Sequence, residues 1–208
     1  MSIKVANSIP IPPPRTEIMR RLGYNRHRNE GIDEDLRRRL DTAIAAAFAL
    51  CRPRGCWIRL DRIFVGPAEV RLADGTVFAG VGLAELLCRS HAIWLAAVTV
   101  GPEISREAAA LAGAGDGAGA AIYDAVGSET ADAALDWLQQ YQAAQLTRSG
   151  EQLTRKRFSP GYSDLALDVQ RDIFRLLRLA DFGMILTDSL MMVPEKSVTA
   201  FAGIENNH

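Results

Sequence analysis

The 208-residue sequence predicts a single α+β domain with a largely antiparallel, twisted sheet flanked by helices. Expected strands fall in groups instead of alternating strictly with helices, which argues against a parallel α/β fold. Asp74-Gly75 lies between two short alternating runs, a signal for a hairpin of antiparallel strands. An Ala-rich run at 118–145 indicates one long helix whose small side chains allow close packing.

Residues 1–15 are expected to form a proline-rich, extended arm that precedes a domain spanning 16–208. Proline fixes φ and keeps the preceding residue out of the helical region. The prolines of the arm are Pro10, Pro12, Pro13 and Pro14. Ile9 and Ile11 would allow the arm to lie on another surface, whereas a simple tail fits the prolines equally well, so both interpretations remain open.

Apolar side chains recur at helical spacing soon after the arm. Leu36, Leu40 and Ile44 lie on one face of a predicted helix, and Gly23 ends a shorter helix before it. Alternating or continuous apolar runs then indicate strands, the last of which is buried. In this half of the chain we expect helices at 17–23, 33–50, 83–88 and 103–111, and strands at 57–65, 68–73, 76–79 and 92–100.

A run of alternating glycines, Gly113, Gly115, Gly117 and Gly119, precedes the long helix. It does not fit the dinucleotide-binding pattern G-x-G-x-x-G, because residue 118 is Ala and no strand leads directly into the run. We therefore expect a flexible connector here and not a phosphate-binding loop.

The last third of the chain combines a loop, a helix and short strands. Pro160-Gly161 breaks both regular structures, so 157–162 is expected to be a loop after the polar segment 147–156. Pro194-Glu195-Lys196 is expected to join the last two strands in a hairpin. The predicted elements are a helix at 167–179 and strands at 184–187, 190–193 and 198–203.

The scarcity of Lys, His and Cys excludes several kinds of self-contained catalyst. None of the three lysines follows a glycine, so the chain has no Walker A motif. Its 3 Cys are too few for a four-thiolate zinc or iron–sulfur site, and its 3 His do not form H-E-x-x-H. Since a G-x-S-x-G elbow is absent too, we expect no self-contained hydrolase, kinase or metalloprotease.

Charge and hydropathy indicate a protein that binds neither nucleic acid nor membranes. The net charge of −1 gives no electrostatic footprint for a polyanion. The most apolar windows, 43–50 and 92–100, are far shorter than the ~20 residues that a membrane span needs. An odd number of cysteines and the lack of a secretory apolar region favour a cytoplasmic location.

Two linked motifs carry a resemblance to a known family. Residues 157–165 read Arg-Phe-Ser-Pro-Gly-Tyr-Ser-Asp-Leu, and residues 183–194 read Gly-Met-Ile-Leu-Thr-Asp-Ser-Leu-Met-Met-Val-Pro, with Ser197-Val198 following. The first resembles the R-x-x-x-G-Y loop of the activation (AdoMet-binding) domain of cobalamin-dependent methionine synthase. The second resembles that domain's G-x-x-L-T-[ED]-S-x-x-M-x-P stretch, and the consistent spacing makes the pair specific.

The resemblance extends more loosely upstream, over roughly residues 17–203. Leu22-Gly23-Tyr24, a strand that ends at Gly101, and Gly127-Ser128 opening into an acidic helix are similar to small stand-alone members of the group. The resemblance implies an activation-domain fold for the whole domain.

What the resemblance implies about function is reductive reactivation. In this family the domain presents S-adenosyl-L-methionine (AdoMet) to the cobalt of a corrinoid that has oxidised to an inert state. An electron arrives from a reductase such as flavodoxin, and the corrinoid returns to its methyl-transfer cycle. The implied cofactors are AdoMet and a cobalamin bound by a partner.

The residues of the matched loop suit AdoMet. Arg157 is expected to clamp the carboxylate through charge-assisted bonds, each worth roughly 1.5–3 kcal/mol. Gly161 lets the backbone approach the ligand, and Phe158 and Ser159 offer backbone hydrogen bonds. Tyr162 presents a ring face to the sulfonium cation. The expected binding loop is Arg157, Phe158, Ser159, Pro160, Gly161 and Tyr162.

A carboxylate near the sulfonium completes the implied site. The family's Glu on the preceding long helix falls at Asp132, whose side chain is one methylene shorter. Glu129, one helical turn earlier, is the alternative donor of that carboxylate. A third interpretation, in which both are solvated helix acids, also remains open.

The resemblance also implies that the cobalt belongs to a partner. The D-x-H-x-x-G loop that ligates cobalt has no counterpart here, and the family's further C-terminal portion would lie beyond His208. We expect a subunit acting in trans on a corrinoid-binding protein or on the core of a split methionine synthase. Two alternatives stay open: a non-catalytic docking module that has kept the fold but not AdoMet use, and reactivation of another corrinoid methyltransferase.

Overall fold

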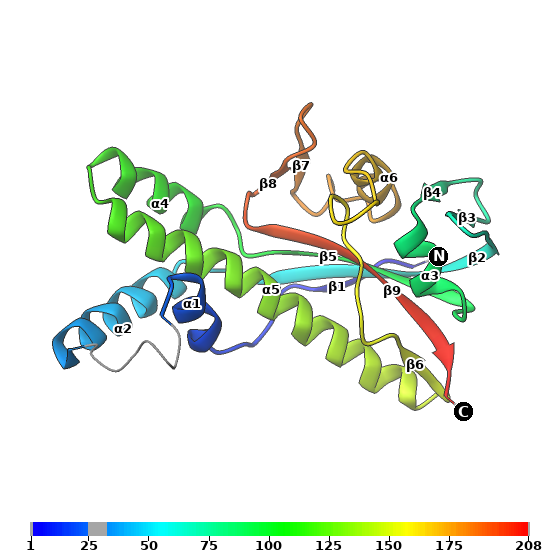
Figure 1. The fold of residues 1–208 in the computed structure, drawn as a ribbon, viewed down its shortest axis with the longest axis horizontal. Helices are drawn as coiled ribbons and strands as arrows, with labels where there is room; N and C mark the ends of the chain where they lie inside the picture. Colours follow the sequence, from blue (N-terminus) through cyan, green and yellow to red (C-terminus); the bar gives the residue numbers. More distant parts are fainter. Residues whose placement is uncertain (1, 25–32, 208) are drawn as a thin grey trace.

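An antiparallel sheet forms the centre of the molecule (Figure 1). Over residues 2–24 and 33–207, which the computed structural model describes, seven strands pair in it in the order β4-β3-β2-β5-β9-β6, with β1 beside β2. Two further strands, β7 and β8, pair only with each other. The strands are β1 (Lys4–Ala6), β2 (Arg54–Val65), β3 (Glu69–Leu72), β4 (Val77–Ala79), β5 (Ala92–Thr99), β6 (Glu151–Leu153), β7 (Ile185–Leu186), β8 (Met192–Val193) and β9 (Ser197–Asn206).

Helices cover both faces of this sheet and form a bundle at one end. The helices are α1 (Arg15–Arg21), α2 (Glu34–Phe48), α3 (Val81–Leu87), α4 (Glu103–Gly113), α5 (Gly117–Thr147) and α6 (Val169–Leu176). Figure 1 shows α5 crossing the sheet along its length, with α1, α2 and α4 gathered around its first half. The α+β fold class predicted from the sequence is confirmed. No helix in the described ranges is long and apolar enough to cross a membrane.

The central strand β5 explains how one sheet supports two cores. Every residue of β5 is buried, and successive side chains point to opposite faces. One face packs with α3 and α6, and the other packs with α5. The two sets are Ile93, Leu95 and Ala97 on the first face, and Trp94, Ala96 and Val98 on the second.

The N-terminal arm packs against the domain. β1 pairs with the start of β2, and Lys4 lies opposite Trp57. Ile9 is only 2% exposed, and its N–H donates to the carbonyl of Pro53 at 2.9 Å. The backbone of the arm is thus satisfied by the domain, which decides between the two interpretations of Ile9 in favour of packing.

The glycine run does not form the flexible connector that the sequence predicted. α4 continues to Gly113, and α5 already begins at Gly117. Gly115 has φ +86° and donates to Ala112, while the Asp116 N–H donates to Leu111, which is the Schellman termination of α4. The Asp116 side chain then accepts from the N–H of Gly119 and caps α5. Capping and packing between the two helices outweigh the low helix propensity of glycine.

One prediction for the last third was wrong. The strands at 190–193 and 198–203 do not form a hairpin around Pro194–Lys196, because β8 pairs with β7 while β9 pairs with β5 and β6. The polar segment 147–156, for which the sequence predicted no element, contains β6. Both results arise from pairings between residues far apart in the sequence.

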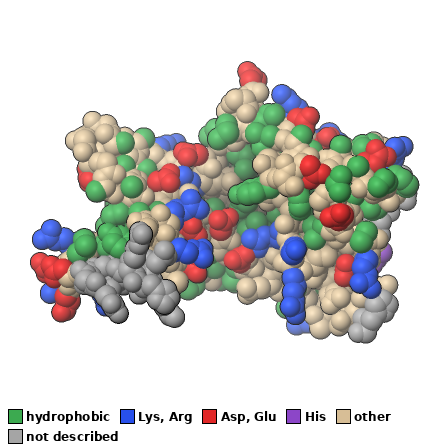
Figure 2. Space-filling view, viewed as in Figure 1, with side chains coloured by type: hydrophobic (Ala, Val, Ile, Leu, Met, Phe, Trp, Pro, Cys, Tyr) green, Lys and Arg blue, Asp and Glu red, His purple; other side chains and the backbone are tan. Residues whose placement is uncertain are grey.

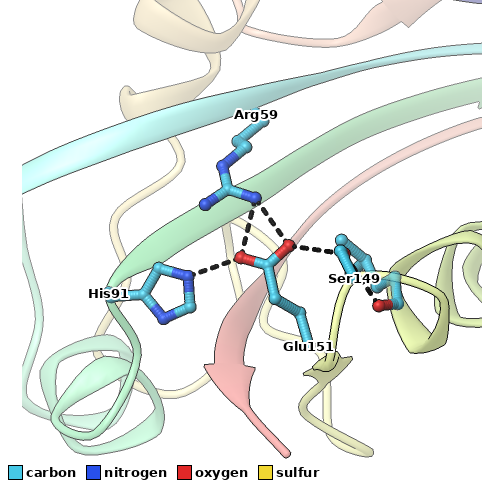
Figure 3. A network of polar contacts seen from close by, with 5 residues as sticks. Arg59, His91, Ser149 and Glu151 are labelled. Carbon is cyan, nitrogen blue, oxygen red and sulfur yellow. Dashed lines mark hydrogen bonds and ion pairs between the residues drawn. The ribbon is translucent and has the colours of Figure 1, made fainter.

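An ion-pair network holds the β6 edge of the sheet (Figure 3). Both carboxylate oxygens of Glu151 accept from Arg59, at 2.9 and 3.0 Å, and Glu151 also contacts His91 Nε2 at 2.7 Å and Ser149 Oγ at 3.1 Å. These contacts outweigh the effect of burial and lower the pKa of Glu151. The network therefore ties β6 to β2 and to the start of β5.

Candidate functional site

A groove of about 310 Å³ lies between α5, the loop 157–165 and the start of β9. Its volume is at the lower end of the range typical of small-molecule sites, roughly 300–1,000 Å³. Side chains from these segments and from the residue before β8 meet in its wall: Asp132, Ser159, Pro160, Tyr162, Met191 and Lys196. Figure 2 shows acidic and basic side chains mixed across the middle of this face, with apolar side chains beside them.

The loop predicted as the binding segment has a defined backbone. The N–H of Phe158 donates to the carbonyl of Phe201 at 3.0 Å, and the N–H of Phe201 donates back at 2.8 Å. Gly161 has φ +86°, which favours glycine, and its N–H donates to the carbonyl of Leu165 at 2.8 Å. Because the Phe158 amide is committed to β9, backbone donors for a ligand must come from farther along the loop.

Three of the six loop residues predicted to bind the cofactor line the groove. Ser159, Pro160 and Tyr162 are in its wall, and the Tyr162 side chain is 72% exposed. Phe158 and Gly161 instead shape the loop, the first through its packing on β9 and the second through its turn. The groove therefore has an exposed tyrosine in its wall.

Hydrogen bonds between α3 and Asp164 hold the loop 157–165 in place. The Asp164 carboxylate accepts from the N–H groups of Val81 and Gly82, in the first turn of α3. These backbone donors outweigh desolvation and lower the pKa of Asp164. Gly82 also makes room for the Phe158 ring, since a Cβ there would come within 2.6 Å of Phe158 Cζ. The sequence placed Asp164 in the motif but gave no signal for its partner.

Asp132 faces the groove from α5, whereas Glu129 does not line it. Partial desolvation raises the pKa of Asp132, the neighbouring Glu129 raises it further, and Arg157 and Arg21 oppose the change. Glu129 is 8% exposed, and its carboxylate accepts from Arg21 Nε at 2.5 Å. Of the two acids that the sequence offered, Asp132 is the one that lines the groove.

Arg157 lies outside the groove wall. Its guanidinium donates to Asp136 and to Gln139 Oε1, both on α5, at 2.5 and 2.8 Å. Arg157 lines two other hollows in common with Asp136, and one of them shares Asp132 with the groove. The predicted carboxylate clamp is thus paired within the protein.

Lys196 is a groove residue that sequence reasoning missed. Its side chain is only 10% exposed, and Nζ contacts Asp124 Oδ1 at 2.5 Å and Glu195 Oε1 at 3.2 Å. In the sequence Lys196 belongs to the turn expected at Pro194–Lys196. A charged residue directly before the matched Ser197-Val198 was the available signal, but its burial depends on α5 packing beside it.

Comparisons with known proteins agree with this architecture. No protein-family model and no curated protein matches the chain. Among solved structures, 13 chains match, including the MetH reactivation domain bound to AdoHcy, with a TM-score of 0.69 and 18% sequence identity. The match covers 98% of this chain and 78% of that one. With so few identical residues the likeness establishes architecture alone, and this chain has the fold of the MetH reactivation domain.

Proposed function

We propose that this chain binds AdoMet in the groove and supports the reductive remethylation of an oxidised corrinoid carried by a partner protein. The observation that carries the proposal is the meeting of Ser159, Pro160, Tyr162 and Asp132 around one groove, in the fold of a domain solved with AdoHcy bound. The matched loop and the acid on α5 are far apart in sequence, and the fold brings them together.

The groove suits the chemistry of AdoMet. The ligand carries a sulfonium and an ammonium cation. Partial burial and the neighbouring Glu129 raise the pKa of Asp132 more than Arg157 and Arg21 lower it, so a cation placed beside this carboxylate favours its ionised form. An exposed tyrosine ring attracts a cation placed over its face, by about 0.5–1 kcal/mol. Tyr162 and Asp132 therefore supply a ring face and a negative charge to the cationic end of the ligand.

When bound, AdoMet supplies the methyl group, and this chain's residues hold and orient it. Asp132 and Tyr162 position the sulfonium at the mouth of the groove, and the loop anchored by Asp164 keeps that mouth in place. The corrinoid is a substrate brought by the partner. The groove must therefore open toward the surface of this chain on which the partner docks.

The rim of the groove supports docking of such a partner. Met191 lines the groove and is 55% exposed, and Ile185 and Val193, which pair with each other in the adjoining strands β7 and β8, are 63% and 43% exposed. An apolar rim of this kind is typical of an interaction surface. We propose a corrinoid-binding protein or a methionine synthase core as the partner, cobalamin as its cofactor, and a flavodoxin-type reductase as the electron donor.

Titration calorimetry with AdoMet and AdoHcy tests the proposal. We expect binding to the wild type, and a two- to fivefold weaker affinity for Tyr162→Ala, which is roughly the loss of one exposed cation–π contact. Tyr141→Ala is the matched control, because Tyr141 lies on α5 outside the groove wall. Absence of heat and of any thermal shift at millimolar ligand, alone and with a corrinoid protein, would refute the proposal.

A second candidate function is a docking module that has kept the fold without using AdoMet. The pairing of Arg157 with Asp136 and Gln139 favours it, because the family's expected clamp does not reach the groove. Such a module would support turnover of the partner equally with and without AdoMet. Identifying the corrinoid protein that co-purifies with this chain separates a methionine synthase from a methyltransferase acting on methylated amines or ethers.

A further inference from the structure

We infer that Lys196, and not Arg157, binds the carboxylate of the ligand's amino-acid end. The inference rests on the proposed function, since it names the residue of the same groove that recognises one group of AdoMet. Among the described residues, Lys196 is the one lysine or arginine in the groove wall. Arg157, which the matched motif would assign to this task, lines other hollows.

The ammonium of Lys196 is held in place but retains a free donor. Nζ carries three N–H groups, and within the described ranges it makes two polar contacts, with Asp124 and Glu195. The side chains of those two acids are 54% and 59% exposed, so solvent competes with both contacts. A third N–H therefore remains for a carboxylate in the groove.

The aliphatic part of the Lys196 side chain packs closely against α5 at Gly127. A Cβ on Gly127 would come within 2.9 Å of Lys196 Cγ and within 3.2 Å of Ile104 Cγ1. Glycine at this point of the helix lets the stem pass close to the backbone, so that the charged end reaches the groove wall. The ammonium is thus presented by a packed stem with little freedom to move away.

The charges of the groove match those of AdoMet group by group. The ionisable side chains in the wall include two acids, Asp132 and Glu195, and the single cation Lys196. AdoMet carries two cations, the sulfonium and the ammonium, and one carboxylate. Binding thus places each ligand charge beside an opposite charge of the wall, with the carboxylate at Lys196.

Arg157 is already paired with other residues of the protein. Its contacts with Asp136 and Gln139 hold it in two other hollows, so it would have to leave them to reach a ligand in the groove. Lys196 lines both the groove and a neighbouring hollow that contains Asp124, and its second partner Glu195 lines both as well. The ammonium therefore has only to turn between two hollows that its side chain already lines.

Decarboxylated AdoMet provides the test, because it lacks only the group in question. We expect the wild type to bind AdoMet about 10- to 100-fold more tightly than decarboxylated AdoMet, as one or two charge-assisted hydrogen bonds would give. Lys196→Met is expected to reduce this preference to less than about twofold. Lys156→Met is the matched control, because Lys156 is exposed and outside the groove wall.

Arg157→Gln gives an independent answer even if the Lys196 variant fails to fold. We expect it to retain the wild-type preference for AdoMet. Loss of the preference in Arg157→Gln, or its survival in a folded Lys196→Met, would overturn the inference. Equal binding of both ligands by the wild type would overturn the inference and leave the proposed function standing. Binding of neither ligand would overturn the proposed function and the inference with it.

Discussion

Asp132 carries a charge that its surroundings disfavour. Its folded pKa is raised, so the ionised carboxylate lowers stability at pH values above that pKa, and this cost disappears below the ordinary value of 3.8. Asp132→Asn is therefore expected to melt at a higher temperature at neutral pH and to bind AdoMet more weakly. Calorimetric melting at neutral pH and near ~pH 3, together with ligand titration, measures both effects.

The same linkage predicts how AdoMet binding depends on pH. The ligand's cations favour ionised Asp132, so affinity should fall as the pH is lowered through the raised pKa of this group. A neutral-pH melting temperature of Asp132→Asn below that of the wild type would contradict this account of the carboxylate.

Glu151 is the opposite case, an acid whose folded pKa is lowered by its partners. Its contribution to stability is present above the unfolded value of about 4.5 and is lost as the pH falls through the folded pKa. We expect Glu151→Gln to cost about 1–2 kcal/mol at neutral pH, discounted because Arg59 is 44% exposed. Chemical denaturation across pH checks this, with the exposed Glu107→Gln as control.

A constant cost of Glu151→Gln down to the lowest pH would show that the network in Figure 3 does not work through the charge of Glu151. The alternative cause would then be packing at the β6 edge. The pH profile separates the two because packing does not titrate with this carboxylate.

The sequence predicted some features of the candidate site and missed others. Ser159, Pro160 and Tyr162 were predictable because a contiguous motif places them on one loop. The pairing of Arg157 with Asp136 was not, since a side chain's partner across 21 residues depends on how the chain returns to α5. Lys196 was missed for the same reason. It is buried beside α5, where its partner Asp124 lies 72 residues earlier in the sequence.

At the scale of elements, the first turn of α3 supports the loop 157–165. Gly82→Ala would place a Cβ within 2.6 Å of Phe158 Cζ and within 3.2 Å of Asp164 Oδ1. An aromatic ring cannot move aside as the end of a flexible chain does, so we expect a loss of about 1–3 kcal/mol and weaker AdoMet binding. Thermal unfolding and ligand titration measure the two effects.

Gly117→Ala is the matched control for this prediction. A Cβ on Gly117 meets nothing within 4 Å among the described residues, and its helical position favours alanine by roughly 0.5–1 kcal/mol. If Gly82→Ala is as stable as the wild type and binds AdoMet equally, the link from α3 to the loop is wrong.

The pairing of β9 shows that the sequence can predict a strand without predicting which strands it pairs with. Its apolar run was predicted as a strand at 198–203, but its partners were assigned to the neighbouring strand across a proline turn. In the structure β9 pairs along most of its length with β5 and at its end with β6, and its side chains enter the cores on both faces of the sheet. Burial of a long apolar strand between two others outweighs a short local hairpin, and that gain appears only when the whole sheet assembles.

At the scale of the whole molecule, the arm contributes to the core beneath α5. Ile9 is 2% exposed and belongs to the same cluster as Trp57 and Leu138. Ile9→Ala is expected to cost about 2–5 kcal/mol, the usual range for a buried isoleucine. The half-buried Ile11→Ala should cost clearly less, and denaturant midpoints for the two variants provide the comparison.

Equal stability of Ile9→Ala and the wild type would show that the arm is a tail after all. A loss in the expected range would instead make residues 4–14 a structural part of the domain. The strand pairing of Lys4–Ala6 with β2 predicts that the loss accompanies cooperative unfolding of the whole sheet.

The sequence by itself determined the α+β class, most helix and strand positions, the loop at 157–162 and the resemblance to the activation domain. These properties are local, because periodicity, turn residues and contiguous motifs act over a few residues. The tertiary structure alone decided the pairing of β9, the packing of the arm, and which charges line the groove. Each of these depends on contacts between distant segments, whose free energy of burial and ion pairing exists only in the assembled fold.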